Sequence, residues 1–117
     1  MRYRMCITLA YPSLNPLVFK SFTEFRENTT LPIGAAGSCW SGKFVLLVCA
    51  DTDKTSSGAS LIDAGFTAHP SMLVMRTDIE NVKLPLCISN GTLDIHLKPD
   101  GMEVVNEIFK EKKKGEV

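Results

Sequence analysis

The sequence predicts an α/β protein in which about three parallel strands are flanked by helices. Two observations lead to this fold class. Segments with the apolar spacing of a helix alternate with short apolar segments along the chain, which is typical of a parallel sheet with helices on both faces. A glycine-rich turn also joins one predicted strand directly to a predicted helix. With 117 residues, the chain is long enough for one modest domain.

The first predicted helix covers about residues 15–27. Asn15 and Pro16 read as an N-cap followed by proline at the first helical position. Val18, Phe22 and Phe25 then repeat at positions i, i+4 and i+7, which forms one apolar stripe. Residues 1–13 carry little pattern, so we divide the chain into a poorly patterned N-terminal segment, 1–13, and an α/β domain, 14–117.

Three short apolar segments, 31–37, 62–68 and 84–89, predict buried strands. The segment 41–50 is apolar all round, so periodicity alone does not distinguish strand from helix there. We predict a helix because the segment follows a glycine-rich turn. The polar segment 52–60 predicts a loop. Thr77 and Glu80 have the spacing of a capping box at the start of a short helix, and 100–114 predicts a last helix that stops near Gly115.

Composition excludes several classes of protein. Thirteen basic and thirteen acidic residues give a formal net charge of zero, which argues against a basic nucleic-acid binder. No stretch of about 18 apolar residues is available to span a membrane. The four cysteines form no C-x-x-C pair, so no metal site is predicted, and they suggest a reducing compartment such as the cytoplasm. Cys49 and Cys87 lie in apolar segments and read as small buried hydrophobic residues.

The segment that carries chemistry is Gly37-Ser38-Cys39-Trp40-Ser41-Gly42. It lies between a predicted strand and a predicted helix, which is the context of a nucleophile elbow with small residues on both sides of the nucleophile. Cys39 would be the nucleophile, and the Trp40 N–H would supply half of an oxyanion hole. The N-terminus of the following helix favours negative charge on a thiol and on an oxyanion. The alternative is that Cys39 is a buried cysteine after a glycine-rich turn, and the hexapeptide leaves both open.

The segment from Ile33 to Lys43 resembles the elbow of the dienelactone hydrolase family in its fungal form. Three further segments are similar to this family, namely Phe25-Arg26-Glu27-Asn28, Ala68-His69-Pro70-Ser71 and Leu84-Pro85-Leu86-Cys87-Ile88 with Gly91 and Asp94. The family consists of α/β-hydrolases with a Cys-Asp-His triad. The resemblance therefore implies a partial α/β-hydrolase fold, Cys39 as nucleophile and Asp94 as the triad acid. It also implies an ester or lactone substrate and no cofactor or metal.

Three departures from the family pattern affect this expectation. Ser41 stands where the family usually has glycine, in a crowded part of the elbow. The family's catalytic histidine follows the acid at some distance, whereas this sequence contains only His69 and His96. The family's first strands have no counterpart before about residue 14. We therefore expect a truncated member with impaired hydrolase activity. The alternative is a non-catalytic remnant, either an unstable fragment or an interaction module that self-associates through exposed sheet edges.

Overall fold

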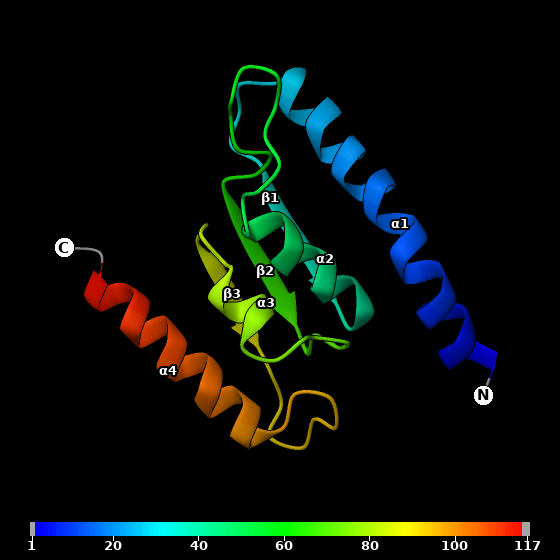
Figure 1. Cartoon of the computed structure of the whole chain (residues 1–117), viewed down its shortest axis with the longest axis vertical. Coiled ribbons are helices and arrows are strands. Elements are labelled where there is room, and N and C mark those ends of the chain that lie inside the picture. The colour runs from blue at the N-terminus through cyan, green and yellow to red at the C-terminus, as the bar shows by residue number, and fades with distance from the viewer. Residues whose placement is uncertain (1, 116–117) are drawn as a thin grey trace.

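The computed structural model describes the backbone of residues 2–115 and the side chains of residues 14–113. Helices and strands alternate along the chain (Figure 1). Their bounds are α1 Arg2–Glu27, β1 Gly34–Ser38, α2 Trp40–Cys49, β2 Ala64–Ala68, α3 Thr77–Glu80, β3 Leu86–Ser89 and α4 Pro99–Gly115.

The strands form one parallel sheet in the order β1-β2-β3. The register places Ala36 beside Phe66 and Phe66 beside Cys87. Since β2 lies between the other two strands, β1 and β3 are the edges of the described sheet. This arrangement confirms the predicted α/β class with three parallel strands and flanking helices.

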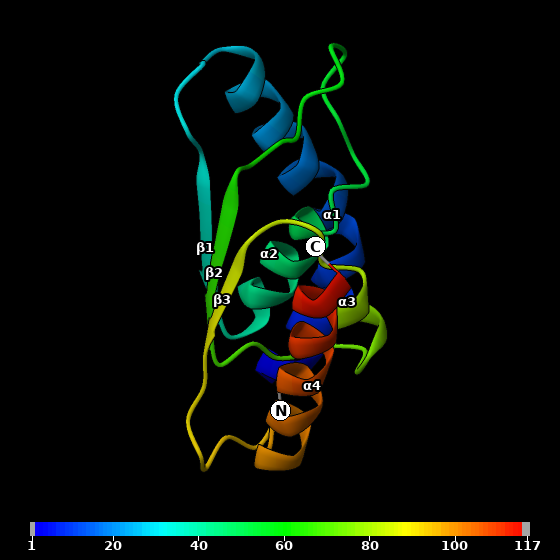
Figure 2. The ribbon, with the colours of Figure 1, turned by 90° about the vertical axis from the view of Figure 1, so that its left-hand side faces the viewer.

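The four helices all lie on one face of the sheet (Figure 2), so the prediction of helices on both faces is wrong. Successive side chains of a strand point to opposite faces, and here only one of those faces is covered. Side chains on the bare face are mostly small, such as Ala36, with Phe66 as a large exception that is 45% exposed. Cys87 lies on this face and is exposed, which corrects its assignment as a buried residue. Short strands rich in alanine and glycine read as buried on both sides because small residues fit either environment.

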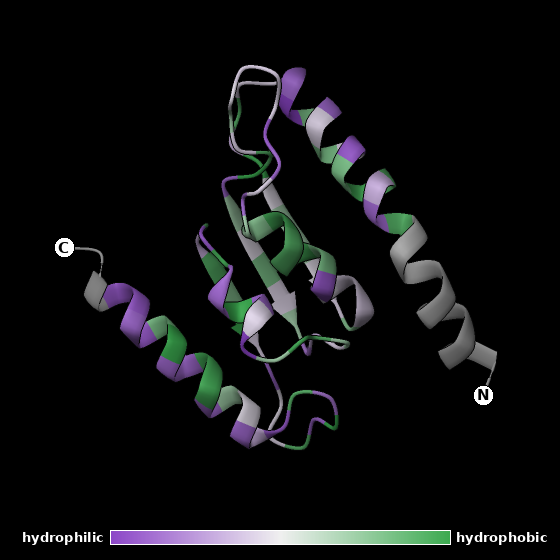
Figure 3. Ribbon diagram, viewed as in Figure 1, coloured by the Kyte–Doolittle hydropathy of each residue, from purple (hydrophilic) through white to green (hydrophobic). Residues whose placement is uncertain are grey.

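Helix α2 forms the centre of the core. It is hydrophobic over most of its length (Figure 3), and it packs on β1 and β2. A Cβ atom at Gly65 in β2 would lie 2.6 Å from Cys49 Sγ and 2.8 Å from Val45 Cγ1, so this glycine permits the close approach of helix and sheet. The core continues to α3 and α4 through buried apolar side chains, among them Leu61, Ile62, Ile79, Leu97, Val105 and Ile108.

Two helix starts differ from the sequence predictions. Helix α1 begins at Arg2, not at Asn15, and residues 2–13 therefore belong to the same helix as residues 14–27. The Asn15 Oδ1 atom is buried without a hydrogen-bond partner, so it does not act as a cap. A helix can continue through a proline if it gives up one backbone hydrogen bond. The Asn15-Pro16 signal therefore does not exclude a helix that begins earlier in the chain.

The capping box predicted for α3 is also absent. Arg76 precedes the helix at the N-cap position, with φ 66°, and no side chain caps the helix. Glu80 instead accepts a hydrogen bond from Arg76 Nε at 3.1 Å. Within the described part of the chain, no helix combines the length and the apolar character that crossing a membrane requires.

Candidate active site

Cys39 occupies the sharp turn between β1 and α2. Its backbone has φ 56° and ψ −125°, a left-handed conformation that costs a non-glycine residue about 1–3 kcal/mol. Three backbone hydrogen bonds hold the turn. The Cys39 N–H donates to Ala68 O at 3.1 Å, and Cys39 O accepts from the N–H groups of Gly42 at 3.1 Å and Ser71 at 3.0 Å. The strained strand–turn–helix arrangement predicted for Gly37–Gly42 is therefore present.

The fold requires one glycine on each side of Cys39, namely Gly37 and Gly42. A Cβ atom at Gly37 would lie 2.7 Å from Ser41 O, and one at Gly42 would lie 2.3 Å from Thr67 Oγ1 and 2.9 Å from Pro70 Cβ. Backbone and buried side chains cannot retreat from such contacts without moving the turn. The glycine pattern that pointed to an elbow thus has a steric cause in this fold.

Ser41 fits the elbow without displacing it. Its hydroxyl donates to Ser38 O at 2.7 Å and accepts from the Ser38 N–H at 2.9 Å. These two bonds connect the first turn of α2 to the end of β1. The departure from glycine at this position therefore adds hydrogen bonds to the turn that holds Cys39.

Trp40 is the first residue of α2, so its N–H has no acceptor four residues earlier within the helix. This N–H and the positive end of the helix dipole lie directly after Cys39, where they favour negative charge. Trp40 is 37% exposed. It meets the Phe44 ring edge to face, with centroids 5.8 Å apart.

Ser71 is a neighbour of Cys39 that sequence reasoning did not single out as a site residue. Ser71 Oγ lies 3.8 Å from Cys39 Sγ, and the residue is only 4% exposed. It follows β2 by three residues, and its place beside Cys39 depends on the parallel pairing of β1 with β2. The only signal for Ser71 in the sequence was the His-Pro-Ser segment, and this segment did not predict a contact between Ser71 and Cys39.

Asp94 lies in the loop after β3, at the same end of the sheet as the elbow (Figure 1). Its carboxylate accepts hydrogen bonds from the backbone N–H groups of His96 and Leu97, both at 2.7 Å. The Leu97 N–H, the His96 N–H and the nearby charges of His96 and His69 hold the pKa of Asp94 below its ordinary value, although desolvation opposes them. The hydrogen bonds described for this carboxylate stay within its own loop, and none reaches Cys39.

The two histidines are both exposed. The His69 N–H donates to Ser89 O at 2.8 Å, which joins the ends of β2 and β3, and its φ is 35°. His96 is held by Asp94 through its backbone. Among residues 14–113, no hydrogen bond connects a histidine with the Cys39 thiol, and no group of acidic, histidine and cysteine side chains is arranged to hold a metal ion.

A groove of about 350 Å³ adjoins the elbow between α1, β1 and α2. Trp40 and Ser41 line it on the side of the elbow. Its other lining residues are apolar, namely Leu14, Val18, Phe22, Ala35, Ala36, Phe44 and Val45. An uncharged, hydrophobic group is the ligand that such a lining favours.

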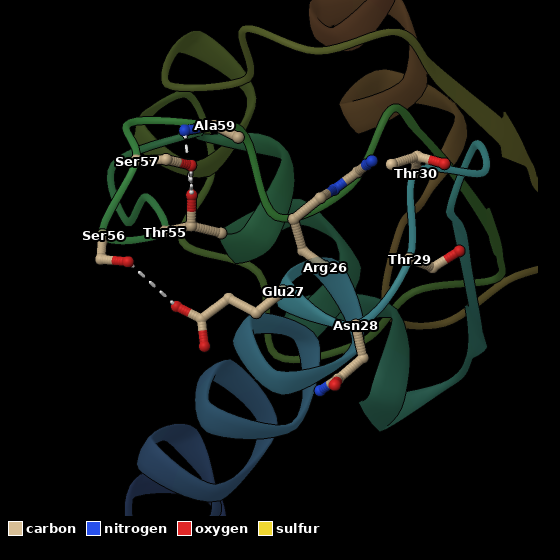
Figure 4. Close-up of a pocket in the computed structure, with 9 residues that line it drawn as sticks. All are labelled: Arg26, Glu27, Asn28, Thr29, Thr30, Thr55, Ser56, Ser57 and Ala59. Atoms are coloured by element: carbon tan, nitrogen blue, oxygen red, sulfur yellow. Dashed lines mark hydrogen bonds between the residues drawn. The ribbon is translucent and has the colours of Figure 1, made fainter.

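A larger pocket, of about 910 Å³, is lined by the end of α1 and the 55–59 loop (Figure 4). These segments lie at the opposite end of the sheet from the elbow (Figure 1). Hydroxyl groups of the 29–30 and 55–57 segments line the pocket together with Arg26 and Glu27. Arg26 is paired with Asp63 at 2.5 Å, and Glu27 accepts from Ser56 at 3.5 Å. In open parallel sheets ligands bind beyond the carboxyl ends of the strands, so the elbow end is the better candidate.

In comparisons with known proteins, the chain matches no protein-family model, no curated protein and no solved structure.

Proposed function

We propose that this protein is a hydrolase of the dienelactone hydrolase type, which cleaves an ester or lactone with Cys39 as the nucleophile. The observation that carries the proposal is the strained backbone of Cys39 at the junction of β1 and α2. Strain of this kind persists where the surrounding structure enforces it, and it concentrates at functional sites. A buried structural cysteine would need no such turn.

The reaction has two steps. In the first, Cys39 Sγ attacks the carbonyl carbon, and the Trp40 N–H stabilises the oxyanion of the tetrahedral intermediate. The C–O bond then breaks, the thiol proton passes to the leaving alcohol, and a thioester remains on Cys39. In the second step water attacks the thioester, which releases the carboxylic acid and restores the thiol.

The apolar groove beside Trp40 and Ser41 supports a substrate with an uncharged hydrophobic group. The Ser41 hydroxyl lines this groove, and it is already hydrogen-bonded to the backbone N–H and the backbone carbonyl of Ser38. We propose no cofactor and no metal for this reaction. A reduced Cys39 is required, which fits the reducing environment of the cytoplasm.

We expect slow turnover, because neither His69 nor His96 is hydrogen-bonded to Cys39 in the described structure. General base catalysis contributes about 10²–10⁴-fold to such reactions. Asp94 in the role of triad acid would need a histidine between its carboxylate and Cys39, and its present bonds go to its own loop. The thioester should therefore accumulate.

The test is a burst of p-nitrophenol from p-nitrophenyl butyrate, with intact-mass analysis of the acylated protein. We expect a burst of about one equivalent in the parent and an acyl group on the peptide that contains Cys39. Cys39→Ala should abolish the burst, and Cys87→Ser, which removes an exposed thiol elsewhere, should leave it intact. A burst that survives in Cys39→Ala would refute the proposal.

Self-association of two copies is a second candidate function, and the bare face of the sheet favours it (Figure 2). The edge strand β1 has the sequence Gly-Ala-Ala-Gly-Ser. It lacks the lysine, proline or bulge with which proteins protect exposed edges. Phe66 adds an exposed aromatic ring to the same face.

Sedimentation velocity over a range of concentrations tests this second candidate. Phe66→Lys should lower the fraction of dimer, because it places a charge on the bare face. Phe25→Lys is the matched control, since Phe25 is an exposed phenylalanine on α1. Equal dimer fractions in both variants, or a monomer throughout, would exclude association through the bare face of the sheet.

A further inference from the structure

The hydroxyl of Ser71 faces the sulfur of Cys39 from the loop that follows β2. The two atoms are 3.8 Å apart, and either could donate the hydrogen bond. Ser71 is buried, and a buried hydroxyl requires a hydrogen-bond partner. Among the described residues, the Cys39 sulfur is the partner that the structure supplies to this hydroxyl.

We propose that Ser71 is a positioning residue that donates a hydrogen bond to the Cys39 thiolate and so favours the reactive form of the nucleophile. This inference rests on the function proposed above and adds the group that supports Cys39 in the absence of a bonded histidine. A thiolate accepts hydrogen bonds far better than a thiol does, because hydrogen bonds to charged groups are about twice as strong as neutral ones. The hydroxyl is therefore best satisfied when the sulfur is ionised.

The backbone fixes the position of this hydroxyl. The Ser71 N–H donates to Cys39 O at 3.0 Å, and the preceding Pro70 is buried against Gly42. The Ser71 segment is thus attached to the elbow at two points before its side chain is considered. A donor held in this way loses little entropy when it bonds the sulfur, which is the condition for effective preorganisation.

Charged groups around the elbow do not take over this role. His69 is on the same loop but exposed, and Lys43, near the start of α2, is paired with Asp78. Asp94 is bonded within its own loop. Of the side chains described here, the Ser71 hydroxyl is the one whose hydrogen bond reaches the Cys39 sulfur.

The test measures the rate at which iodoacetamide alkylates Cys39 near neutral pH, in a background where Cys6 and Cys87 are replaced by serine. Ser71→Ala should lower this rate about tenfold, the effect of one hydrogen bond to a charged group. It should also weaken the ultraviolet absorbance of the thiolate at the same pH. Ser89→Ala is the matched control, because Ser89 is an exposed serine at the same end of the sheet.

A second pair of variants separates the hydroxyl from packing. Ser71→Thr and Ser71→Val add the same volume, and only threonine keeps the hydroxyl, so the threonine variant should react faster. Equal rates in this pair would overturn the proposal even if Ser71→Ala failed to fold.

Alkylation is independent of ester cleavage, so a rate that depends on Ser71 without any acyl burst would refute the hydrolase function and leave this inference standing. A burst combined with alkylation that does not depend on Ser71 would support the hydrolase function and overturn this inference.

Discussion

Lys43 and Asp78 form an ion pair inside the protein, with side chains only 7% and 8% exposed. The pair connects α2, which begins at the elbow, to α3. Asp78 Oδ2 also accepts a hydrogen bond from the Val74 N–H at 2.7 Å. One carboxylate therefore holds both the helix that follows Cys39 and the loop that carries Ser71. The pair thus joins the two segments that carry the candidate active site, although neither residue is part of the site.

Breaking this pair should destabilise the fold strongly. Lys43→Met leaves the Asp78 carboxylate buried without a counter-charge, which typically costs about 3–5 kcal/mol. Adding Asp78→Asn removes that charge and keeps an acceptor for the Val74 N–H, so the double variant should be more stable than the single one. Urea unfolding followed by circular dichroism measures both. A single variant as stable as the parent would show that the pair contributes nothing.

Gly42 should not tolerate a side chain. In Gly42→Ala the new methyl group would lie 2.3 Å from Thr67 Oγ1, and we expect a loss of about 1–3 kcal/mol from overpacking. Gly91→Ala is the control, because nothing lies within 4 Å of a Cβ atom there and its effect should stay within about 0.5 kcal/mol. Thermal unfolding compares the two, and equal losses would contradict the steric explanation.

The cysteines of the described region should differ widely in reactivity. Burial, with a smaller contribution from the charge of Asp51, raises the pKa of the Cys49 thiol to about 11. Cys49 should stay unmodified in the folded protein, whereas the exposed Cys87 should be alkylated and Cys39 should react faster than Cys87. Peptide mapping after brief alkylation gives the order. Labelling of Cys49 without unfolding would contradict the burial that places it in the core.

Asp94 should stabilise the fold in a pH-dependent way. Its pKa is lowered in the folded state, first by the Leu97 N–H and then by the His96 N–H and the charges of His96 and His69. The stabilisation is therefore complete above the unfolded pKa of about 3.9, and it is lost as the pH falls through the lower folded value. The difference in urea midpoint between the parent and Asp94→Ala should be steady near pH 6 and shrink below about pH 4. A difference that grew in acid would contradict the hydrogen bonds seen at this carboxylate.

Local patterns in the sequence predicted well those elements whose conformation depends on neighbouring residues. The apolar segment that became α2 and the glycines at 37 and 42 are local signals, because a tight turn excludes side chains from its immediate surroundings. The position of Cys39 in a strained turn between strand and helix followed from these signals. The start of α1 and the N-cap of α3 did not, since Asn15 and Thr77 carry capping signals that the fold leaves unused.

The sequence by itself determined the alternation of helices and strands and the elbow, because each follows from spacing along a few consecutive residues. The parallel sheet was predicted indirectly, from that alternation. Only the tertiary structure decided that all helices lie on one face, that Cys87 is exposed, and that Ser71 rather than a histidine is hydrogen-bonded to the Cys39 sulfur. These facts depend on the pairing of strands far apart in the chain and on the packing of α2. Small residues such as Ala36 and Gly65 are compatible with either face of a sheet, so their sequence does not specify which face is covered.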